Sequence, residues 1–307
     1  MDAPTFYLAA TVAQIVLPFL LCLLLLPLER NLPRRPAASS FRQRWQINIP
    51  LGLAGVTLGV LGSYYLSTRI GSLGASFAVM SLAAIAIPPS VKFLSGLMII
   101  DLMAYGLHVL AHKLGVLWRL HQIHHSDNEF DASTGLRHQP LEGLVNMCVL
   151  TFGFGLIGMP FAIIASYGVL AAMHAILSHA NVAIPPRVDR VLRLLIVTPD
   201  MHRLHHSADR AEYDSNYGQV FPYWDWLFRT LRAKPVTEQA KMPLGLGKVA
   251  DSRNLTALQL TLLPFGPYAL SQGNSGESRK RGSARAETSR ASRARQTGRP
   301  EKAKRKR

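Results

Sequence analysis

Residues 5–28 form an uncharged, almost wholly apolar run that ends in a stretch of four leucines before Pro27. A helix of this length crosses the roughly 30 Å hydrocarbon layer of a bilayer. A cleaved signal peptide would have basic residues before the run and a small-residue cleavage site after it. Here the first charge is Asp2, and the run is followed by Arg30 and Arg34. We therefore predict a retained membrane span.

Two further apolar runs have the length of a span. They cover residues 47–67 and 93–111, and the second holds a single acid, Asp101. A shorter apolar stretch at 74–87 ends at two prolines, which predicts an interfacial or half-embedded helix.

The longest apolar run, residues 143–178, is interrupted by Gly158-Met159-Pro160. Proline and glycine end helices, so this run predicts a broken helical hairpin that dips into the bilayer and returns to the same side. The fold class expected is an all-α integral membrane protein with about four transmembrane helices, counting the hairpin.

The charge of the chain supports this class. Only 17% of the residues are charged, against about 25% in soluble domains. Residues 271–307 contain 13 Lys and Arg and three acids, and so carry ten of the sixteen net positive charges. That segment has almost no apolar residues and is predicted to be a disordered basic tail. We expect it to contact anionic lipid headgroups rather than nucleic acid.

The loops predict the orientation. Five arginines lie between the first two runs, whereas residues 68–73 contain only Arg69; the five are Arg30, Arg34, Arg35, Arg42 and Arg44. The positive-inside rule places the 29–46 loop in the cytoplasm. Counting onward, His112 and the C-terminal tail are then cytoplasmic as well.

The chain is thus divided into four parts. Residues 1–92 hold the N-terminal helices and the interfacial helix, and residues 93–230 form a catalytic domain. Residues 231–270 form a C-terminal cap segment and 271–307 the tail. Residues 180–257 are mixed in character and predict a cytoplasmic cap over the helices, and the apolar stretch 258–270 is expected to be packed or interfacial.

All eleven histidines lie between residues 108 and 206 and are clustered. The clusters are His108 and His112, then His121, His124 and His125, then His138 alone, then His174 and His179, and finally His202, His205 and His206. Spacings of three and four residues put side chains on one face of a helix. Because the two His-x-x-His-His triplets resemble each other, they predict two similar halves of a metal-pair site.

The metal must be held by nitrogen and oxygen ligands. The two cysteines, Cys22 and Cys148, both lie in apolar runs, so neither a disulfide framework nor a cysteine metal site is expected. Imidazole serves Zn, Cu, Fe and Ni alike. Oxidation of an unactivated C–H bond in a lipid chain requires a redox metal and oxygen, which favours iron over zinc. Asp101 falls on the helical stripe of His108 and is expected to orient its ring.

Several motifs, in this order, resemble the fatty acid hydroxylase/sterol desaturase superfamily of membrane oxygenases. The resemblance covers about 93–230. Besides the histidine clusters, it includes Tyr105, Thr134-Gly-Leu-Arg137, Pro140-Leu-Glu142, Asn216-Tyr217-Gly218 and the segment from Trp224 to Thr230. It implies a di-iron site, oxygen as co-substrate, and electrons from a separate cytochrome b5-like or ferredoxin-type protein.

The resemblance also implies the ligand set: His108, His112, His121, His124, His125, His179, His202, His205 and His206, with His174 added. His138 is displaced by one position from the family pattern. From their positions, we expect six further residues to orient the ligand side chains: His138, Asp101, Asp127, Asp131, Asp200 and Asp225.

The expected function is hydroxylation or desaturation of the alkyl part of a lipid. The candidate substrates are a fatty acyl chain, an aminolipid such as an ornithine lipid, a hopanoid or sterol, and an ether lipid. Two alternatives are a zinc-dependent membrane hydrolase, for which no HExxH-type pair is found, and a non-enzymatic metal-binding membrane protein.

Overall fold

A computed structural model describes residues 3–246 and 255–266, whose regular structure is helical, with two isolated bridges in place of any β-strand. The long helices are α1 (Ala3–Asn31), α2 (Phe41–Ser76), α3 (Pro89–Lys113), α4 (Gly115–His125), α5 (Pro140–Leu156) and α6 (Phe161–Ser178). The short ones are η1 (Ala132–Leu136), α7 (Pro186–Leu192), α8 (Pro199–His205), α9 (Arg210–Tyr213), α10 (Tyr223–Leu227), α11 (Val236–Gln239), α12 (Ala257–Leu262) and η4 (Leu263–Phe265). The tail predicted for 271–307 lies outside the described residues.

Four of the described helices are long and apolar enough to cross a membrane. The spans are Leu8–Asn31, Phe41–Gly62, Pro89–Lys113 and Phe161–Ser178, with Pro140–Leu156 as a shorter apolar helix. The all-α membrane class is therefore confirmed. At about 1.5 Å per residue, the 36 residues of α2 extend about 54 Å, well beyond the hydrocarbon layer.

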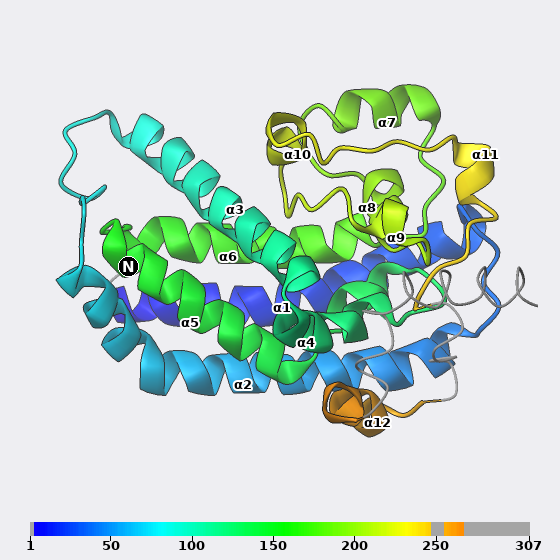
Figure 1. Ribbon diagram of the computed structural model, residues 1–307, viewed down its shortest axis with the longest axis horizontal. Helices are drawn as coiled ribbons and strands as arrows, with labels where there is room; N and C mark the ends of the chain where they lie inside the picture. The colour runs from blue at the N-terminus through cyan, green and yellow to red at the C-terminus, as the bar shows by residue number, and fades with distance from the viewer. Residues whose placement is uncertain (1–2, 247–254, 267–307) are drawn as a thin grey trace, which may run out of the picture. The chain divides into compact units, whose positions relative to one another are not determined.

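The helices pair along their lengths, α2 against α5 and α1 against α6 (Figure 1). Small residues allow the first pair to touch backbone to backbone. An ideal Cβ on Gly74 would lie 2.1 Å from the carbonyl oxygen of Phe152, and one on Gly155 would lie 2.2 Å from that of Gly71. Close approach through small residues is how membrane helices gain van der Waals contact when lipid offers no hydrophobic driving force.

The broken hairpin is confirmed. α5 ends at Leu156, α6 begins at Phe161, and Gly158 between them has a φ of 52°, in the left-handed region. A side chain at Gly158 would also collide with Ser81, since an ideal Cβ lies 2.6 Å from its Oγ. The turn thus requires glycine for two reasons.

The interfacial helix expected over 74–87 does not form. α2 continues to Ser76, and the following residues up to Pro88 are turns and bends. The backbone N–H groups of Val79, Leu82 and Ala83 bond the carbonyls of Leu156, Ile157 and Gly158. This segment therefore satisfies the carbonyls at the end of α5, which a local reading of the sequence does not reveal.

One end of the bundle gathers the functional segments. α1, α3 and α6 end there, α2 and α5 begin there, and α7–α11 lie over it as a cap (Figure 1). In the apolar stretch that was expected to be packed or interfacial, Leu260 of α12 is fully buried against Leu51 of α2 and Ile123 of α4, whereas Leu258, Leu262 and Phe265 are exposed.

Candidate metal centre

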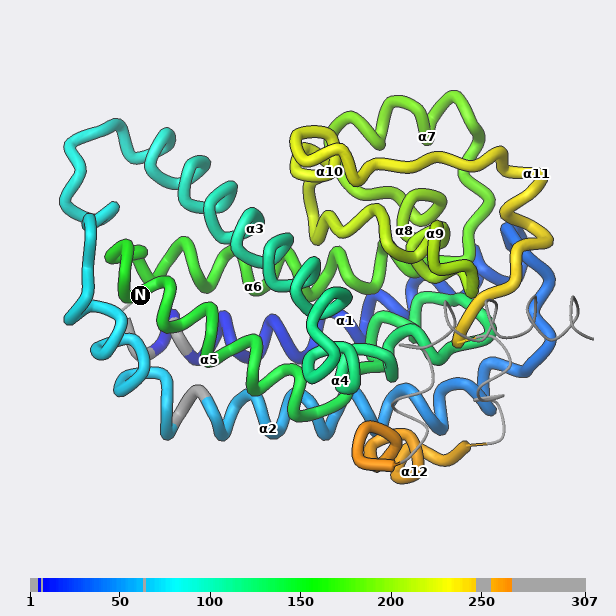
Figure 2. Tube along the Cα trace, in the orientation of Figure 1, coloured from blue at the N-terminus to red at the C-terminus, as the bar shows by residue number. Residues whose placement is uncertain are grey.

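The first histidines come from α3 and α4, which meet at a sharp bend (Figure 2). His108 and His112 lie one turn apart at the end of α3, and α4 begins two residues after α3 ends. α4 buries His121, His124 and His125 together. Five imidazoles are thus placed by two consecutive helices.

The remaining histidines come from the end of α6 and from α8. His179 is the C-cap residue of α6. α8 starts with Pro199 at its first position, where the missing N–H has no helical partner to lose, and carries His202 and His205, with His206 as its C-cap.

These nine histidines divide into two groups whose ligand nitrogens lie within 4.8 Å of one another. One group contains five histidines, His108, His112, His121, His125 and His205, and the other contains four, His124, His179, His202 and His206. Each triplet predicted from the sequence contributes to both groups, because adjacent histidines such as His124 and His125 point in different directions.

Two of the nitrogens in the group of four, those of His124 and His179, face each other as acceptors. Nε2 of His179 lies 3.2 Å from Nε2 of His124, 3.1 Å from that of His206 and 3.0 Å from that of His202. The Nδ1 atoms of His179 and His124 face the carbonyls of Ala175 and Arg137, so Nδ1 carries the proton and Nε2 is a lone pair. Two lone pairs cannot share a hydrogen bond.

A cation between these nitrogens removes the conflict. Two imidazole nitrogens bound at about 2.1 Å to one ion and at right angles to each other would lie about 3.0 Å apart. In the group of five, Nε2 of His121 and His125 are 3.2 Å apart, and the buried Nε2 atoms of His108, His112 and His205 have no hydrogen-bond partner. Both groups therefore fit a metal ion bound through nitrogen.

Where the other ring nitrogen has a hydrogen-bond partner, that partner is mostly a backbone carbonyl. Nδ1 of His108 bonds the carbonyl of Tyr217 at 2.8 Å, and Nδ1 of His205 bonds that of Ser215 at 2.7 Å. One acid does the same, since Glu142 Oε1 lies 2.6 Å from Nδ1 of His121. Asp214 Oδ1 lies 3.5 Å from Nδ1 of His112 without a hydrogen bond between them. The hydrogen-bonded partners fix the ring orientation and leave Nε2 free for metal.

Burial keeps the imidazoles neutral. It lowers the pKa of His124, His125, His202, His205 and His206 well below the usual value, with a further decrease from neighbouring histidines. Burial also lowers the pKa of His179, to about 3. A neutral imidazole is the form that binds a metal.

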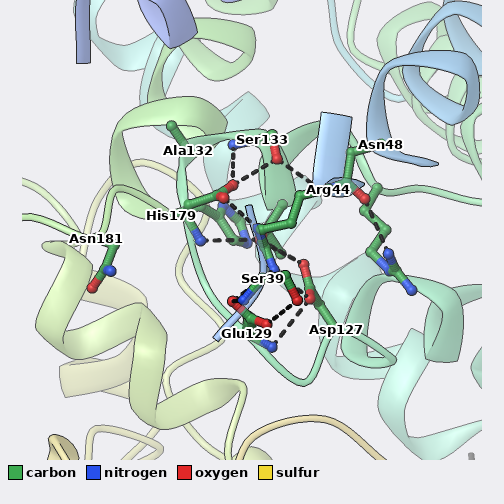
Figure 3. Close-up of polar contacts among 12 residues, drawn as sticks. Ser39, Arg44, Asn48, Asp127, Glu129, Ala132, Ser133, His179 and Asn181 are labelled. Atoms are coloured by element: carbon green, nitrogen blue, oxygen red, sulfur yellow. Dashed lines mark hydrogen bonds and ion pairs between the residues drawn. The ribbon is translucent and has the colours of Figure 1, made fainter. Parts of the chain in front are cut away.

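Asp127 and Asp131, expected to support the ligands, bind Arg44 of α2 (Figure 3). Both oxygens of Asp127 pair with the Arg44 guanidinium, at 3.0 and 2.9 Å, and Thr134 joins them. Burial alone would raise the pKa of Asp127, but the charges of Arg44 and Arg137 hold it at about 2. The two carboxylates therefore anchor the loop after His125 to α2.

The other three aspartates bind outside the histidine groups. Asp200 pairs with Arg34, at 2.9 Å, and with Arg203. Asp101 accepts hydrogen bonds from the hydroxyl of Tyr167, at 2.6 Å, and from the indole of Trp224, at 2.8 Å. Asp225 accepts bonds from backbone N–H groups of the loop after α9. They hold segments that carry or support ligands and make no hydrogen bond to a ligand ring in the described residues.

His174 and His138 are not brought into either group. His174 is buried on α6, one turn before His179. His138 stacks on His124 with ring centroids 4.2 Å apart, and its Nδ1 lies 3.4 Å from Glu142.

The sequence reasoning assigned no role to Glu142 or Asp214. Glu142 belongs to the Pro140-Leu-Glu142 motif and lies in the first turn of a helix, which was the available signal. Asp214 stands in no such motif.

A cavity of about 240 Å³ opens from the histidine groups toward the membrane helices. His108 and His121 of one group and His124 and His179 of the other line it. Its other walls are largely apolar and include Ala104, Leu107, Leu150 and Ala171 from α3, α5 and α6.

Fold and site together define a helical membrane protein with two groups of histidines, at one end of its spans, that could hold metal ions. The fatty acid hydroxylase family matches residues 93–230, which include every histidine of the centre. This match and the relatives below support the fatty acid hydroxylase/sterol desaturase superfamily for this part of the chain.

The curated relatives are enzymes of lipid metabolism. An ornithine lipid hydroxylase, OlsE, from Rhizobium tropici is 31% identical over 53% of this chain and 48% of its own length. The alkylglycerol monooxygenase of Caenorhabditis elegans is 32% identical over 44% of this chain and 26% of its own. A very-long-chain aldehyde decarbonylase, GL1-1, from Oryza sativa subsp. indica is 28% identical over 48% and 24%. The chain thus spans about half or less of the length of these relatives, and no solved structure matches it.

Proposed function

We propose that this protein is a membrane-bound di-iron oxygenase that hydroxylates or desaturates the alkyl part of a lipid with dioxygen. The observation that carries the proposal is the meeting of two histidine groups at the head of an apolar cavity between membrane helices. The relatives, named as a lipid hydroxylase and as alkylglycerol monooxygenases, support the same reaction class.

Each part of the centre has a task in this proposal. Bound iron would supply the one-electron chemistry needed to oxidise a C–H bond. His124 and His179 present Nε2 as ligands because the carbonyls of Arg137 and Ala175 hold their Nδ1 protons. The apolar walls bind the alkyl chain and exclude water from the reacting carbon.

The remaining ligand interactions serve the same end. The carboxylate of Glu142 accepts a hydrogen bond from Nδ1–H of His121 and so raises the basicity of that ligand. Arg137 holds α4 from two sides: its guanidinium bonds the carbonyl of Ile123 and the hydroxyl of Ser126, and its own carbonyl bonds His124.

The partners and the orientation belong to the proposal as well. We propose that a separate cytochrome b5-like or ferredoxin-type protein donates the electrons. The arginines of the loop after α1 support a cytoplasmic position for the metal centre, since this loop lies at the same end of the bundle (Figure 1). We propose that the C-terminal tail is cytoplasmic as well.

Metal analysis combined with lipid mass spectrometry tests the proposal. Protein purified from membranes should contain iron, and with reductant and a lipid extract it should consume oxygen. Comparison of cells with and without the protein should show lipids heavier by one oxygen atom, or lighter by two hydrogens. The variant His124→Ala should abolish the product. Zinc without iron, together with an unchanged lipid profile, would refute the assignment and favour the hydrolase or the non-enzymatic alternative.

A further inference from the structure

A second cavity adjoins the one at the metal centre. It has a volume of about 360 Å³ and lies between α1, α2, α5 and α6. The two cavities share six lining residues, which therefore form the boundary between them: His138, Glu142, Asn146, Ala171, Ala175 and Gln219. Because Ala171 and Ala175 have small side chains, α6 leaves room at this boundary.

Two amide side chains at this boundary have no hydrogen-bond partner among the described residues. They belong to Asn146 on α5 and Gln219 in the loop after α9. By contrast, the Glu142 carboxylate beside them is bonded to His121 and His138. Each amide offers two N–H donors and a carbonyl acceptor. Leaving such groups unpaired between membrane helices is unfavourable, so they are suited to bind a polar group of a ligand.

The backbone on both sides of Gln219 is held in place. Asp225 accepts the N–H groups of Tyr217, at 2.9 Å, and Gly218, at 2.7 Å. Asp101 accepts those of Val220, at 3.1 Å, and Phe221, at 3.3 Å. The two buried carboxylates thus fix the loop at the position where Gln219 lines both cavities.

Both amides lie close to the histidine groups. The carbonyl of Tyr217, two residues before Gln219, bonds the ring of His108. Asn146 is one helical turn from Glu142, about 6 Å along the axis of α5, and Glu142 bonds His121. A ligand group bound to these amides would therefore lie within a few bonds of the carbon presented to the metal centre.

The charge of the walls restricts the ligand further. No Lys or Arg is found among the described residues that line the two cavities, and the acid there, Glu142, is paired with histidines. A carboxylate or phosphate bound at the two amides would have no Lys or Arg beside it, and its nearest positive charge would be the metal centre itself. The site therefore suits a neutral polar group.

We propose that Asn146 and Gln219 form a subsite for the uncharged carbonyl of an ester- or amide-linked acyl chain, and that a free fatty acid is not the substrate. This inference rests on the proposed function, because it assumes that the cavities hold the lipid to be oxidised. The amides are positioning residues that fix which carbon faces the metal centre, while the second cavity receives the rest of the chain.

Binding of four probes with the same chain length tests the subsite: the methyl ester and the N-methyl amide of hexadecanoic acid, hexadecane, and hexadecanoate. The full chain is purified in detergent, and each affinity is obtained from the ligand-dependent rise of the unfolding temperature. The ester and the amide should bind at least about fivefold more tightly than hexadecane and hexadecanoate, the difference that one hydrogen bond provides.

The variants Asn146→Leu and Gln219→Met keep the size of the side chain and remove the amide, and each should abolish this preference. Gln14→Met is the matched control, because Gln14 of α1 lines only the second cavity and packs against Gly168. It should keep the preference. Equal affinity for hexadecane and the amide in the unmodified protein, tight binding of hexadecanoate, or an unchanged preference in both variants would overturn the subsite.

Turnover is measured separately with oxygen and reductant. Selective binding of the amide without any oxidised product would overturn the proposed function and leave the subsite standing. Oxidation of all four probes with equal efficiency would support the oxygenase and overturn the subsite.

Discussion

At the scale of the residue, Glu142 links the metal centre to α5. One carboxylate oxygen lies 2.6 Å from Nδ1 of His121, and the other lies 3.4 Å from Nδ1 of His138. A carboxylate that accepts the second ring proton makes imidazole a stronger donor to a metal and fixes its orientation.

The substitution Glu142→Gln should therefore weaken metal binding by about tenfold or more, the usual effect of losing such a partner. Iron retained by the purified protein at increasing chelator concentration measures this change. Glu238→Gln, which alters an exposed acid of α11, is the control and should behave like the unmodified protein. Equal retention by the two variants would show that Glu142 does not support the ligand.

The sequence predicted which residues lie at the centre better than it predicted what each of them touches. Nine histidines proposed as ligands converge in two groups, because spacings of three and four residues on α3, α4 and α8 impose a common face. The roles expected of the aspartates depended on distant partners. Asp127 binds Arg44, 83 positions earlier, and Asp101 binds Trp224, 123 positions later. No local pattern encodes such pairs.

At the scale of the element, Arg44 fixes the start of α2 to the loop that follows the histidines of α4. Its buried guanidinium faces Asp127 (Figure 3) and also pairs with Asp131. Removing one member of a buried ion network leaves the others without a counter-charge.

Arg44→Met should thus lower the free energy of unfolding by about 3–5 kcal/mol, as for other broken buried pairs. Arg42→Met, at an exposed position of the same helix, should change it by less than about 0.5 kcal/mol. Unfolding by sodium dodecyl sulfate in mixed micelles provides both values. A loss for Arg44→Met no larger than that for Arg42→Met would mean that the network contributes little to stability.

The contact between α2 and α5 gives a second prediction for an element. Because an ideal Cβ on Gly155 would lie 2.2 Å from the carbonyl oxygen of Gly71, Gly155→Ala should force the two helices apart. We expect a loss of about 1–3 kcal/mol in the free energy of unfolding, the range for overpacked sites.

Gly59→Ala is the control for this change. No atom lies within 4 Å of an ideal Cβ at Gly59 of α2, so alanine should be neutral or slightly stabilising there. Similar stability of the two variants in the same micelle titration would exclude the close helix contact.

The spans were predictable because length and apolarity alone define a membrane helix. The segment 77–88 was not, since its form depends on hydrogen bonds to the end of α5, some 75 residues later in the chain. The break at Gly158 was predictable, because a glycine and a proline two residues apart interrupt a helix whatever else packs against it.

At the scale of the whole molecule, the centre joins the ends of two spans, the short helix α4 and the cap. α3, α4, α6 and α8 each bring histidines, and each of the two groups takes members from at least three of these helices or their caps. A fold that brings neutral lone pairs this close stores repulsion unless cations are bound, so metal binding and the packing of the cap on the spans must be coupled.

Because each group has its own ligands, removing a ligand from one group should cost the metal of that group only. His205→Ala removes a ligand from the group of five, and His206→Ala removes one from the group of four. If each group holds one ion, each variant should retain about half of the iron, and the double variant should retain almost none. His138→Ala, outside both groups, should keep both ions, and iron per chain in the purified proteins decides among these outcomes.

Stability should follow the metal content. Iron should raise the unfolding temperature of chelator-treated protein, because a ligand that binds only the folded state stabilises it, by about 2.7 kcal/mol at a hundred times its dissociation constant. The rise should be smaller for either single histidine variant and absent for the double variant. A full complement of iron in the double variant would place the metal elsewhere, and the two groups would then have to be explained as packed, neutral histidines that hold the cap against the spans.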